Sequence, residues 1–387
     1  MKECVFDEVV PRRNSGSYKW DAIPDDVLPL WVADMDFKAA EPIRRALGRR
    51  VEHGVFGYTN VPDAYYDSVI RWFGNRHSWQ IKREEIIYTT GVVPAISAIV
   101  QAMTRPGDKV VLQTPVYNCF FSSVRNSGCQ VVRNELIYHE GTYSIDFDHL
   151  RRITSDDSVR LMILCNPHNP SGRVWTREEL QRIADICISN HVFIISDEIH
   201  CEICMPGIEY TPLASLSEEV RQNCAVCTSP SKSFNIAGLQ IANITIADQR
   251  VRRCVDRIIN RNEVCDVNPF GVDALIAAYN ECGWWVDSLC SYIWANYEYF
   301  ASELARICPS LSVCRLEGTY LAWVDCIGAR RDASSICRDI EYKAKVKFNA
   351  GLMYGDTDDR FFRVNLACPR SILEEALGRI SSACIDL

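Results

Sequence analysis

The apolar positions of this chain follow two different patterns, and the change between them comes near residue 280. From about residue 85, short β-branched runs alternate with stretches of helical periodicity, and the runs are apolar on both faces, as is typical of parallel strands covered by helices. One intervening helix has a clear start, because Thr176 and Glu179 form a capping box. The predicted strands are 86–90, 109–113, 130–136, 160–165, 192–197, 224–228 and 240–247. The pattern therefore predicts a large α/β domain with a mostly parallel, seven-stranded sheet.

The remaining sequence predicts a smaller α+β domain. Segment 284–307 has the periodicity of one long, aromatic-rich helix, and shorter strands are expected at 320–325 and 361–367. The first 45 residues match neither pattern, and we expect them to pack against this second domain. The predicted boundaries are 46–282 for the large domain, and 1–45 together with 283–387 for the small one.

Length, charge and the apolar runs exclude several classes of protein. A chain of 387 residues exceeds what one core usually serves, and a hydrophobic fraction of 48% excludes a disordered chain. The net charge of −8 argues against nucleic-acid binding, which needs a basic face. The N-terminus lacks the features of a signal peptide, and the longest apolar stretch, about twelve residues near 92–103, is too short to span a membrane. We therefore expect a cytoplasmic protein with neither nucleic acid nor membrane as a partner.

Cysteine is unusually abundant, with 19 residues, an odd number that cannot pair completely within one chain. Two C-x-x-C pairs, 201/204 and 224/227, have a spacing seen in zinc sites. About one such pair is expected by chance at this cysteine content. In addition, Cys224 and Cys227 lie on a predicted strand, where residues three apart point to opposite faces. We therefore expect no metal site, and most cysteines to be small apolar side chains in a reducing compartment.

Groups suited to catalysis follow the ends of several predicted strands. Lys232 lies after one of them, and no other lysine occurs between positions 110 and 342. Alone it would be explained as a solvated side chain, but Asp197 ends a buried strand and Asn169 follows the preceding one. Gly91 opens a helix whose free N–H groups suit a phosphate. An amine, a carboxylate, an amide and an anion cradle are the groups that pyridoxal phosphate requires.

The whole sequence resembles the fold-type-I pyridoxal-phosphate enzymes of the aminotransferase superfamily. Within that superfamily it is most similar to the cystathionine β-lyase/C–S lyase branch (MalY/PatB type). Each matching segment is weak alone, but all of them occur in order along the chain. They are 6–20 (FDEVVPRRNSGSYKW), 31–37 (WVADMDF), 57–59 (GYT), 166–172 (NPHNPSG), 196–200 (SDEIH), 231–239 (SKSFNIAGL) and 363–370 (RVNLACPR).

The resemblance implies a role for each matching residue at the reacting end of the cofactor. Lys232 would hold pyridoxal phosphate as a Schiff base and, once freed, would move the substrate α-proton. Asp197 would pair with the ring nitrogen, Tyr117 would stack on the ring face, and Asn169 would donate to the phenolic oxygen. Arg363 would bind the α-carboxylate of the amino-acid substrate, a task suited to its planar guanidinium.

The resemblance also implies a phosphate site and a shared dimer. The backbone amides of Gly91 and Val92, with the hydroxyls of Ser229 and Ser231, would hold the phosphate. Tyr58 would reach the site from the second subunit of a homodimer and is counted with Lys232 and Tyr117 as catalytic.

Two positions depart from the pattern common among aminotransferases. His200, counted here among the cofactor-binding residues, replaces the usual tyrosine, as in the C–S lyase branch, and its role is left open. Gln240 replaces a basic residue that in many relatives contacts the phosphate. The resemblance implies a lyase that cleaves the Cβ–S bond of L-cystathionine or another cysteine S-conjugate, giving a thiol such as homocysteine, pyruvate and ammonia. The alternatives are an aminotransferase, or a lyase with an additional regulatory binding role.

Other residues near the predicted site have simpler explanations. His168 lies in a loop with site residues and is as consistent with a structural role as with a catalytic one. Cys119 and Cys165 flank the site loops, where burial as small apolar side chains is the commoner role. The aromatic residues between 284 and 300 are expected to serve core and subunit packing.

Overall fold

A computed structural model describes residues 5–261 and 266–383 of the chain. The outermost residues of the predicted small domain, 1–4 and 384–387, lie outside this range, as do Cys4, Cys265 and Cys384. Within the described residues, no helix combines the length and the hydropathy needed to cross a membrane.

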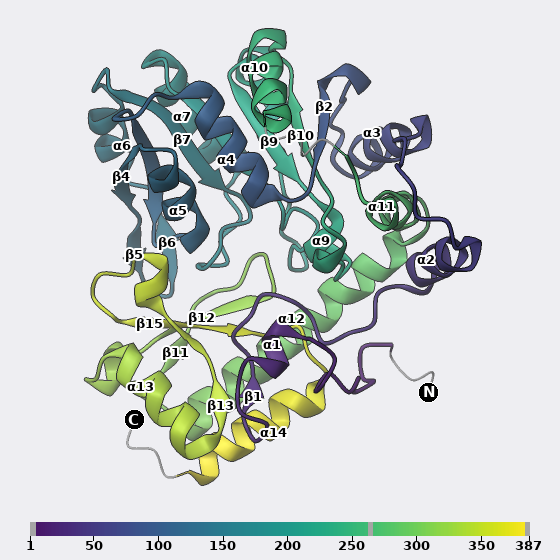
Figure 1. Cartoon of the computed structure of the whole chain (residues 1–387). Helices are drawn as coiled ribbons and strands as arrows, with labels where there is room; N and C mark the ends of the chain where they lie inside the picture. Colours follow the sequence, from purple (N-terminus) through teal and green to yellow (C-terminus); the bar gives the residue numbers. More distant parts are fainter. Residues whose placement is uncertain (1–4, 262–265, 384–387) are drawn as a thin grey trace.

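The larger sheet confirms the predicted α/β class and its mostly parallel, seven-stranded form (Figure 1). Strand β10 is antiparallel to both of its neighbours, and all other pairs are parallel. In spatial order the strands are β2 (Ile86–Thr89), β10 (Ala242–Ile246), β9 (Cys224–Thr228), β8 (Phe193–Asp197), β7 (Val159–Cys165), β3 (Lys109–Thr114) and β4 (Gln130–Glu135).

Helices cover both faces of this sheet because its strands are apolar on both sides. One face forms a core with α4 (Val92–Met103), α5 (Asn118–Asn126) and α10 (Gln249–Asn260). The opposite face packs against α6 (Phe147–Thr154), α7 (Arg177–Ser189), α3 (Asp63–His77) and α11 (Pro269–Glu281). Cys224 belongs to the second core and Cys227 to the first, so the expected opposite orientation of these two cysteines is confirmed.

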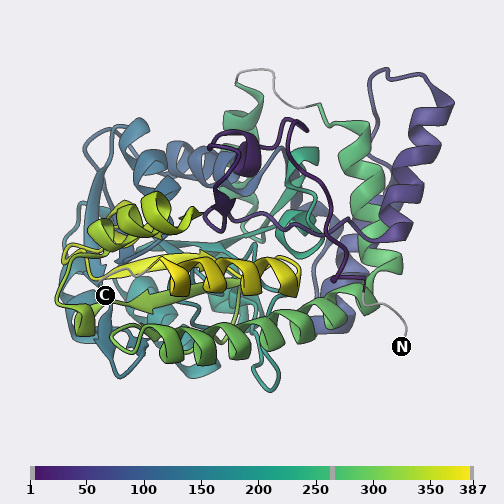
Figure 2. The same ribbon diagram turned by 90° about the horizontal axis from the view of Figure 1, so that it is seen from below.

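A four-stranded antiparallel sheet lies below the large one in Figure 1. Its order is β11 (Ser312–Val313), β12 (Leu321–Asp325), β15 (Phe361–Asn365) and β14 (Asn349–Ala350). The predicted long helix is present as α12 (Gly283–Ile307), and Figure 2 shows it running beside α14 (Arg370–Ser382). The short helix α13 (Ala333–Asp339) packs on this smaller sheet. Other short elements are α8 (Glu218–Gln222), which contacts β9 of the large sheet, and a hairpin formed by β5 (Ile137–His139) and β6 (Thr142–Ser144).

The N-terminal segment contacts the smaller part of the molecule before it reaches the helices beside the large sheet. It contains α1 (Tyr18–Asp21), and its strand β1 (Leu28–Pro29) pairs in parallel with β13 (Val346–Lys347). The chain then enters α2 (Glu41–His53), which packs on α11 beside the large sheet. The segment between β1 and α2 therefore passes between the two sheets.

Half of the predicted strand and helix ends coincide with those in the structure, and the others differ by one or two residues. The predicted strand 240–247 begins two residues later than expected, because Gln240 adopts a left-handed φ of 52° and ends a short 3-10 turn. The predicted capping box is present at the start of α7, where the Thr176 hydroxyl accepts from the Glu179 N–H and the Glu179 carboxylate accepts from the Thr176 N–H.

Candidate active site

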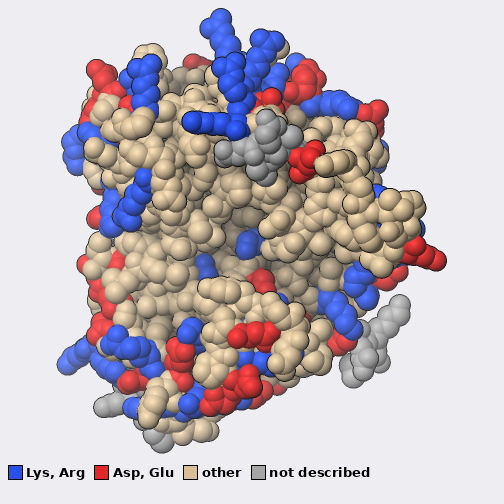
Figure 3. Space-filling view, viewed as in Figure 1, with Lys and Arg blue, Asp and Glu red and all other residues tan. Residues whose placement is uncertain are grey.

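A cavity of about 500 Å³ opens between the two sheets, at the carboxyl ends of the strands in the large one. Figure 3 shows it as a hollow near the centre of one face, with basic and acidic side chains inside. Most residues predicted for the site line it: Gly91, Val92, Tyr117, Asn169, Asp197, His200, Ser231, Lys232 and Arg363. The loops after β2, β7, β8 and β9 converge here, as in other open α/β sheets.

Lys232 lies in α9 (Pro230–Ser233), a single helical turn immediately after β9. The amine donates a hydrogen bond to the Ala33 carbonyl at 2.5 Å. Desolvation, reinforced by the positive charge of Arg363, lowers the pKa of Lys232 to about 8. The amine is therefore far easier to deprotonate than an ordinary lysine.

Asp197 ends β8 and is almost completely buried. Its Oδ1 accepts from the Ile199 N–H at 3.1 Å. Burial raises the pKa of Asp197 to about 7, although the Ile199 hydrogen bond and the Lys232 charge oppose this. Because the buried Asp197 carboxylate accepts so few hydrogen bonds from the protein, it is suited to pair with a cationic N–H group.

Arg363 projects from β15 of the small sheet into the same cavity and is buried. It donates to the Asn169 side-chain oxygen at 2.9 Å and to the Trp31 carbonyl at 3.1 Å, and it lies over the Tyr354 ring at 4.6 Å. Its Nε is buried and has no hydrogen-bond partner within residues 5–261 and 266–383. The guanidinium is thus oriented by its neighbours and retains a free donor for an anion.

The start of α4 forms one wall of the cavity. The N–H groups of Val92 and Val93 lie in its first turn, where helix geometry provides no intrahelical acceptor. No side chain among the described residues caps this end of the helix, so these N–H groups are available to a ligand. A side-chain hydroxyl, that of Ser231, lines the cavity nearby. Ser229 is buried instead: its hydroxyl donates to the Ile241 carbonyl at 2.6 Å and accepts from the Ser231 N–H.

Tyr117 and His200 both line the cavity. Tyr117 stands at the start of α5, and desolvation raises the pKa of its hydroxyl. His200 is buried, its ring packs edge-on against Tyr320 with the ring centres 5.7 Å apart, and its Nδ1 has no hydrogen-bond partner among the residues that the structure describes. Desolvation lowers the pKa of His200 well below its usual value, so the ring is neutral at physiological pH.

Two predicted residues do not line this cavity. Tyr58 is 98% exposed in an extended segment after α2, and Ser229 is buried beneath α9. His168 is also away from the cavity, where its Nδ1 pairs with the Ser171 hydroxyl at 2.8 Å and burial lowers its pKa to about 3. The structure thus places His168 in a packing role within its loop.

Several lining residues were not assigned a role from the sequence. They are the aromatic residues Tyr18, Trp31 and Tyr354, the amide Asn349, and residues such as Ala33 that contribute a backbone carbonyl. Cys119 and Cys165, for which an apolar role was the commoner expectation, also line the cavity. The family-like segments 6–20 and 31–37 gave a sequence signal for Tyr18, Trp31 and Ala33.

The described cysteines are all free thiols, and among residues 5–261 and 266–383 no cluster of His, Cys, Asp or Glu side chains is arranged to hold a metal ion. Cys224 and Cys227 belong to the cores on opposite faces of the large sheet. The two C-x-x-C pairs therefore do not combine into a four-ligand site.

Comparison with known proteins agrees with this geometry. The family model for class I and II aminotransferases matches residues 25–380. Cystathionine β-lyase PatB of Bacillus subtilis (strain 168) is 40% identical over 383 residues, which is 98% of this chain and 99% of PatB. The structure of cystalysin from Treponema denticola, which contains pyridoxal 5′-phosphate, has a TM-score of 0.95 at 35% identity, with 98% of each chain covered. A PLP-bound C–S lyase from Staphylococcus hominis has a TM-score of 0.91 at 31% identity, again over 98% of each chain. The chain therefore belongs to the class I and II aminotransferase family, as its sequence resemblance predicted.

Proposed function

We propose that this protein is a pyridoxal-phosphate-dependent carbon–sulfur lyase. It cleaves the Cβ–S bond of L-cystathionine or another cysteine S-conjugate and releases a thiol, pyruvate and ammonia. The observation that carries this proposal is the Lys232 amine, held with Asp197 and Arg363 in one cavity of a chain that is 40% identical to a cystathionine β-lyase. Solved C–S lyases with the same fold contain this cofactor.

The residues in the cavity fit pyridoxal phosphate. The uncapped first turn of α4 and the Ser231 hydroxyl supply donors for its phosphate. Asp197, buried with few partners and with its pKa raised by that burial, suits the protonated ring nitrogen. Tyr117 supplies an aromatic face and Asn169 an amide near the lysine.

When bound, pyridoxal phosphate would supply an electron sink that stabilises a negative charge on the substrate α-carbon. The Lys232 amine would hold the cofactor until the substrate amine displaces it, and the freed amine would then act as the base at that carbon, because its pKa of about 8 leaves a usable fraction of neutral amine near neutral pH. Arg363 binds the α-carboxylate and fixes which face of the substrate meets the amine. His200 is buried and neutral, so it adds no positive charge beside Lys232 and Arg363.

The enzyme is proposed to work as a homodimer in the cytoplasm. Tyr58 supports this assembly, because a tyrosine exposed over 98% of its surface next to the exposed side chains of Val55 and Phe56 is suited to a subunit contact. In the dimer, Tyr58 would complete the site of the neighbouring subunit.

Lyase and aminotransferase activities are separated by their need for a second substrate. Purified holoenzyme is supplied with L-cystathionine and no keto acid, and both pyruvate and free thiol are measured over many turnovers. The proposal predicts continued release of both products in equal amounts. A strict requirement for an added keto acid would show that the protein is an aminotransferase.

A further inference from the structure

Backbone carbonyls of residues 31–36, here called the 31–36 loop, converge on the side chains of the cavity. The Lys232 amine donates to the Ala33 carbonyl, and the Tyr320 hydroxyl donates to the same oxygen at 2.9 Å. The Asn365 amide donates to the two flanking carbonyls, each at 2.6 Å. The loop therefore meets the lysine through its main chain, so its conformation decides where the acceptor lies.

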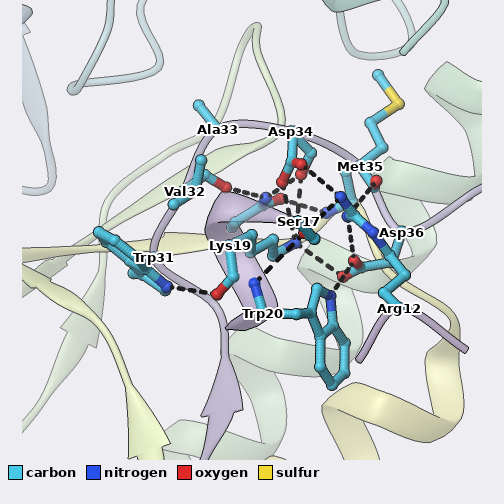
Figure 4. A network of polar contacts seen from close by, with 12 residues as sticks. Arg12, Ser17, Lys19, Trp20, Trp31, Val32, Ala33, Asp34, Met35 and Asp36 are labelled. Carbon is cyan, nitrogen blue, oxygen red and sulfur yellow. Dashed lines mark hydrogen bonds and ion pairs between the residues drawn. The ribbon is translucent and has the colours of Figure 1, made fainter. Parts of the chain in front are cut away.

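Behind the loop, two cations of the N-terminal segment hold its two carboxylates (Figure 4). Lys19 is completely buried; its Nζ lies 2.7 Å from Asp36 Oδ2 and donates to the Asp34 carbonyl at 3.2 Å. Arg12 reaches both carboxylates, with Nη2 2.8 Å from Asp34 and Nη1 2.7 Å from Asp36. The Trp20 indole N–H also donates to Asp36 at 2.7 Å.

Stability alone is a poor explanation for a fully buried ammonium group. The cost of removing an ammonium and a carboxylate from water commonly equals or exceeds their attraction, whereas such pairs can specify one conformation. The 31–36 loop is not part of a helix or strand, so no backbone ladder fixes its shape. The ion pairs of Lys19 and Arg12, together with the Trp20 indole N–H on Asp36, tie its two carboxylates to the N-terminal segment. The loop backbone is held separately, for example by the Asp36 N–H, which donates to the Ala367 carbonyl at 2.9 Å.

We propose that Lys19 and Arg12 are positioning residues for Lys232. By holding the carboxylates of the 31–36 loop, they place the Ala33 carbonyl where it receives the lysine amine. The consequence rests on the proposed function: when Lys232 takes the α-proton, the resulting ammonium has a fixed acceptor and returns to one position in each cycle. The positioning itself concerns only the lysine and the loop.

The loop also contributes to the charge environment of Lys232. Asp34 raises the pKa of the amine, in opposition to desolvation and to Arg363. Release of the loop would withdraw both the Asp34 carboxylate and the Ala33 carbonyl and would leave the other groups in place. The titratable groups that face the amine from all sides are Asp34, Cys119, Asp197, His200 and Arg363.

The direction in which the pKa of Lys232 changes distinguishes the loss of a positioned carbonyl from the loss of a nearby positive charge. In Lys19→Met or Arg12→Met, loss of a positive charge would by itself raise the pKa of Lys232. Loss of the positioned carbonyl lowers it, by about one pH unit for one charge-assisted hydrogen bond. The measurement is acetylation of Lys232 in the cofactor-free full-length protein as a function of pH, with the modified peptide quantified by mass spectrometry.

Arg50→Met is the control, because it breaks an ion pair of similar length, Arg50–Asp273 at 2.7 Å, which joins α2 to α11 and does not involve the loop. The proposal predicts a fall of about one unit in both test variants and no shift in the control. A rise in the pKa, or profiles identical to the control, would overturn it. If neither test variant shows a cooperative thermal transition, the ion pairs hold the fold rather than the lysine, and the proposal is also wrong. Because acetylation reads the amine directly, failure here is distinct from failure of the lyase assignment.

Discussion

Burial in the cavity brings the pKa values of Lys232 and Asp197 close together, although those of a free lysine and a free aspartate lie far apart. The pKa of Lys232 falls to about 8 and that of Asp197 rises to about 7, because each charged form loses hydration that the protein replaces only in part. Neither residue type predicts this behaviour by itself. The shifts follow instead from position: Asp197 ends a buried strand and Lys232 lies directly after another, at the carboxyl ends of the strands where the cavity forms.

Asp197 gives the cofactor-free protein a measurable pH dependence. An aspartate titrates near 3.9 in the unfolded chain and near 7 in the folded one, so between these values the folded state binds more protons and its stability falls as pH rises. Asp197→Asn removes this effect. Relative to wild type, we expect the variant to gain on the order of 2 kcal/mol in free energy of unfolding between pH 5 and pH 8, measured in urea. An unchanged difference at the two pH values would contradict the burial argument.

The reactive side chains of the site could be predicted from the sequence, whereas the backbone groups that contact them could not. Lys232, Asp197 and Asn169 were selected because a scarce amine, a carboxylate and an amide follow the ends of predicted strands, and Arg363 was taken from the family resemblance. Ala33 acts through its carbonyl, which every residue possesses, so no residue pattern marks it. The roles assigned to the predicted side chains stay predictions until they are tested.

At the scale of elements, long apolar runs were predictable and very short pairings were not. All seven strands of the large sheet were expected, because each combines several β-branched or apolar residues with a clear boundary. The two-residue strands β1, β13 and β14 carry no pattern and exist only because tertiary contacts place them together. The left-handed turn at Gln240, which delays β10, likewise leaves no sequence signal.

The capping box of α7 contributes to stability at a distance from the site. Thr176→Ala removes the hydroxyl that accepts from the Glu179 N–H, and we expect a loss of about 1 kcal/mol in free energy of unfolding. Thr176→Ser keeps the hydroxyl and is the matched control. Turnover should be unchanged in both variants. Equal stability of the alanine and serine variants would show that the cap does not contribute.

Across the whole molecule, the site draws on segments far apart in the chain. The N-terminal segment pairs with β13, passes the cavity at residues 31–36, and only then reaches the helices beside the large sheet. The sequence predicted that the first 45 residues pack against the smaller part, because they match neither pattern of the rest. The exact boundaries of the two predicted domains stay a prediction.

The proposed sharing of the site between subunits can be tested with hybrids. Tyr58→Ala and Lys232→Ala proteins are each expected to be strongly impaired. When their subunits are mixed and exchanged, half of the sites in a hybrid dimer combine an intact Lys232 with a Tyr58 from the other subunit. We therefore expect activity to reappear on mixing. Activity that stays at the level of the separate variants would contradict a site completed across the interface.

The central claim is that Lys232 both holds the cofactor and moves the proton. Its most direct test compares Lys232→Ala with Lys109→Ala, which changes a lysine paired with Asp156 on the surface. Visible absorption of the bound cofactor and pyruvate release from L-cystathionine are measured on each protein. For Lys232→Ala we expect loss of the absorption band and a fall in turnover on the order of 10² to 10⁴-fold, with both readouts normal in the control. Full turnover in Lys232→Ala would contradict the account.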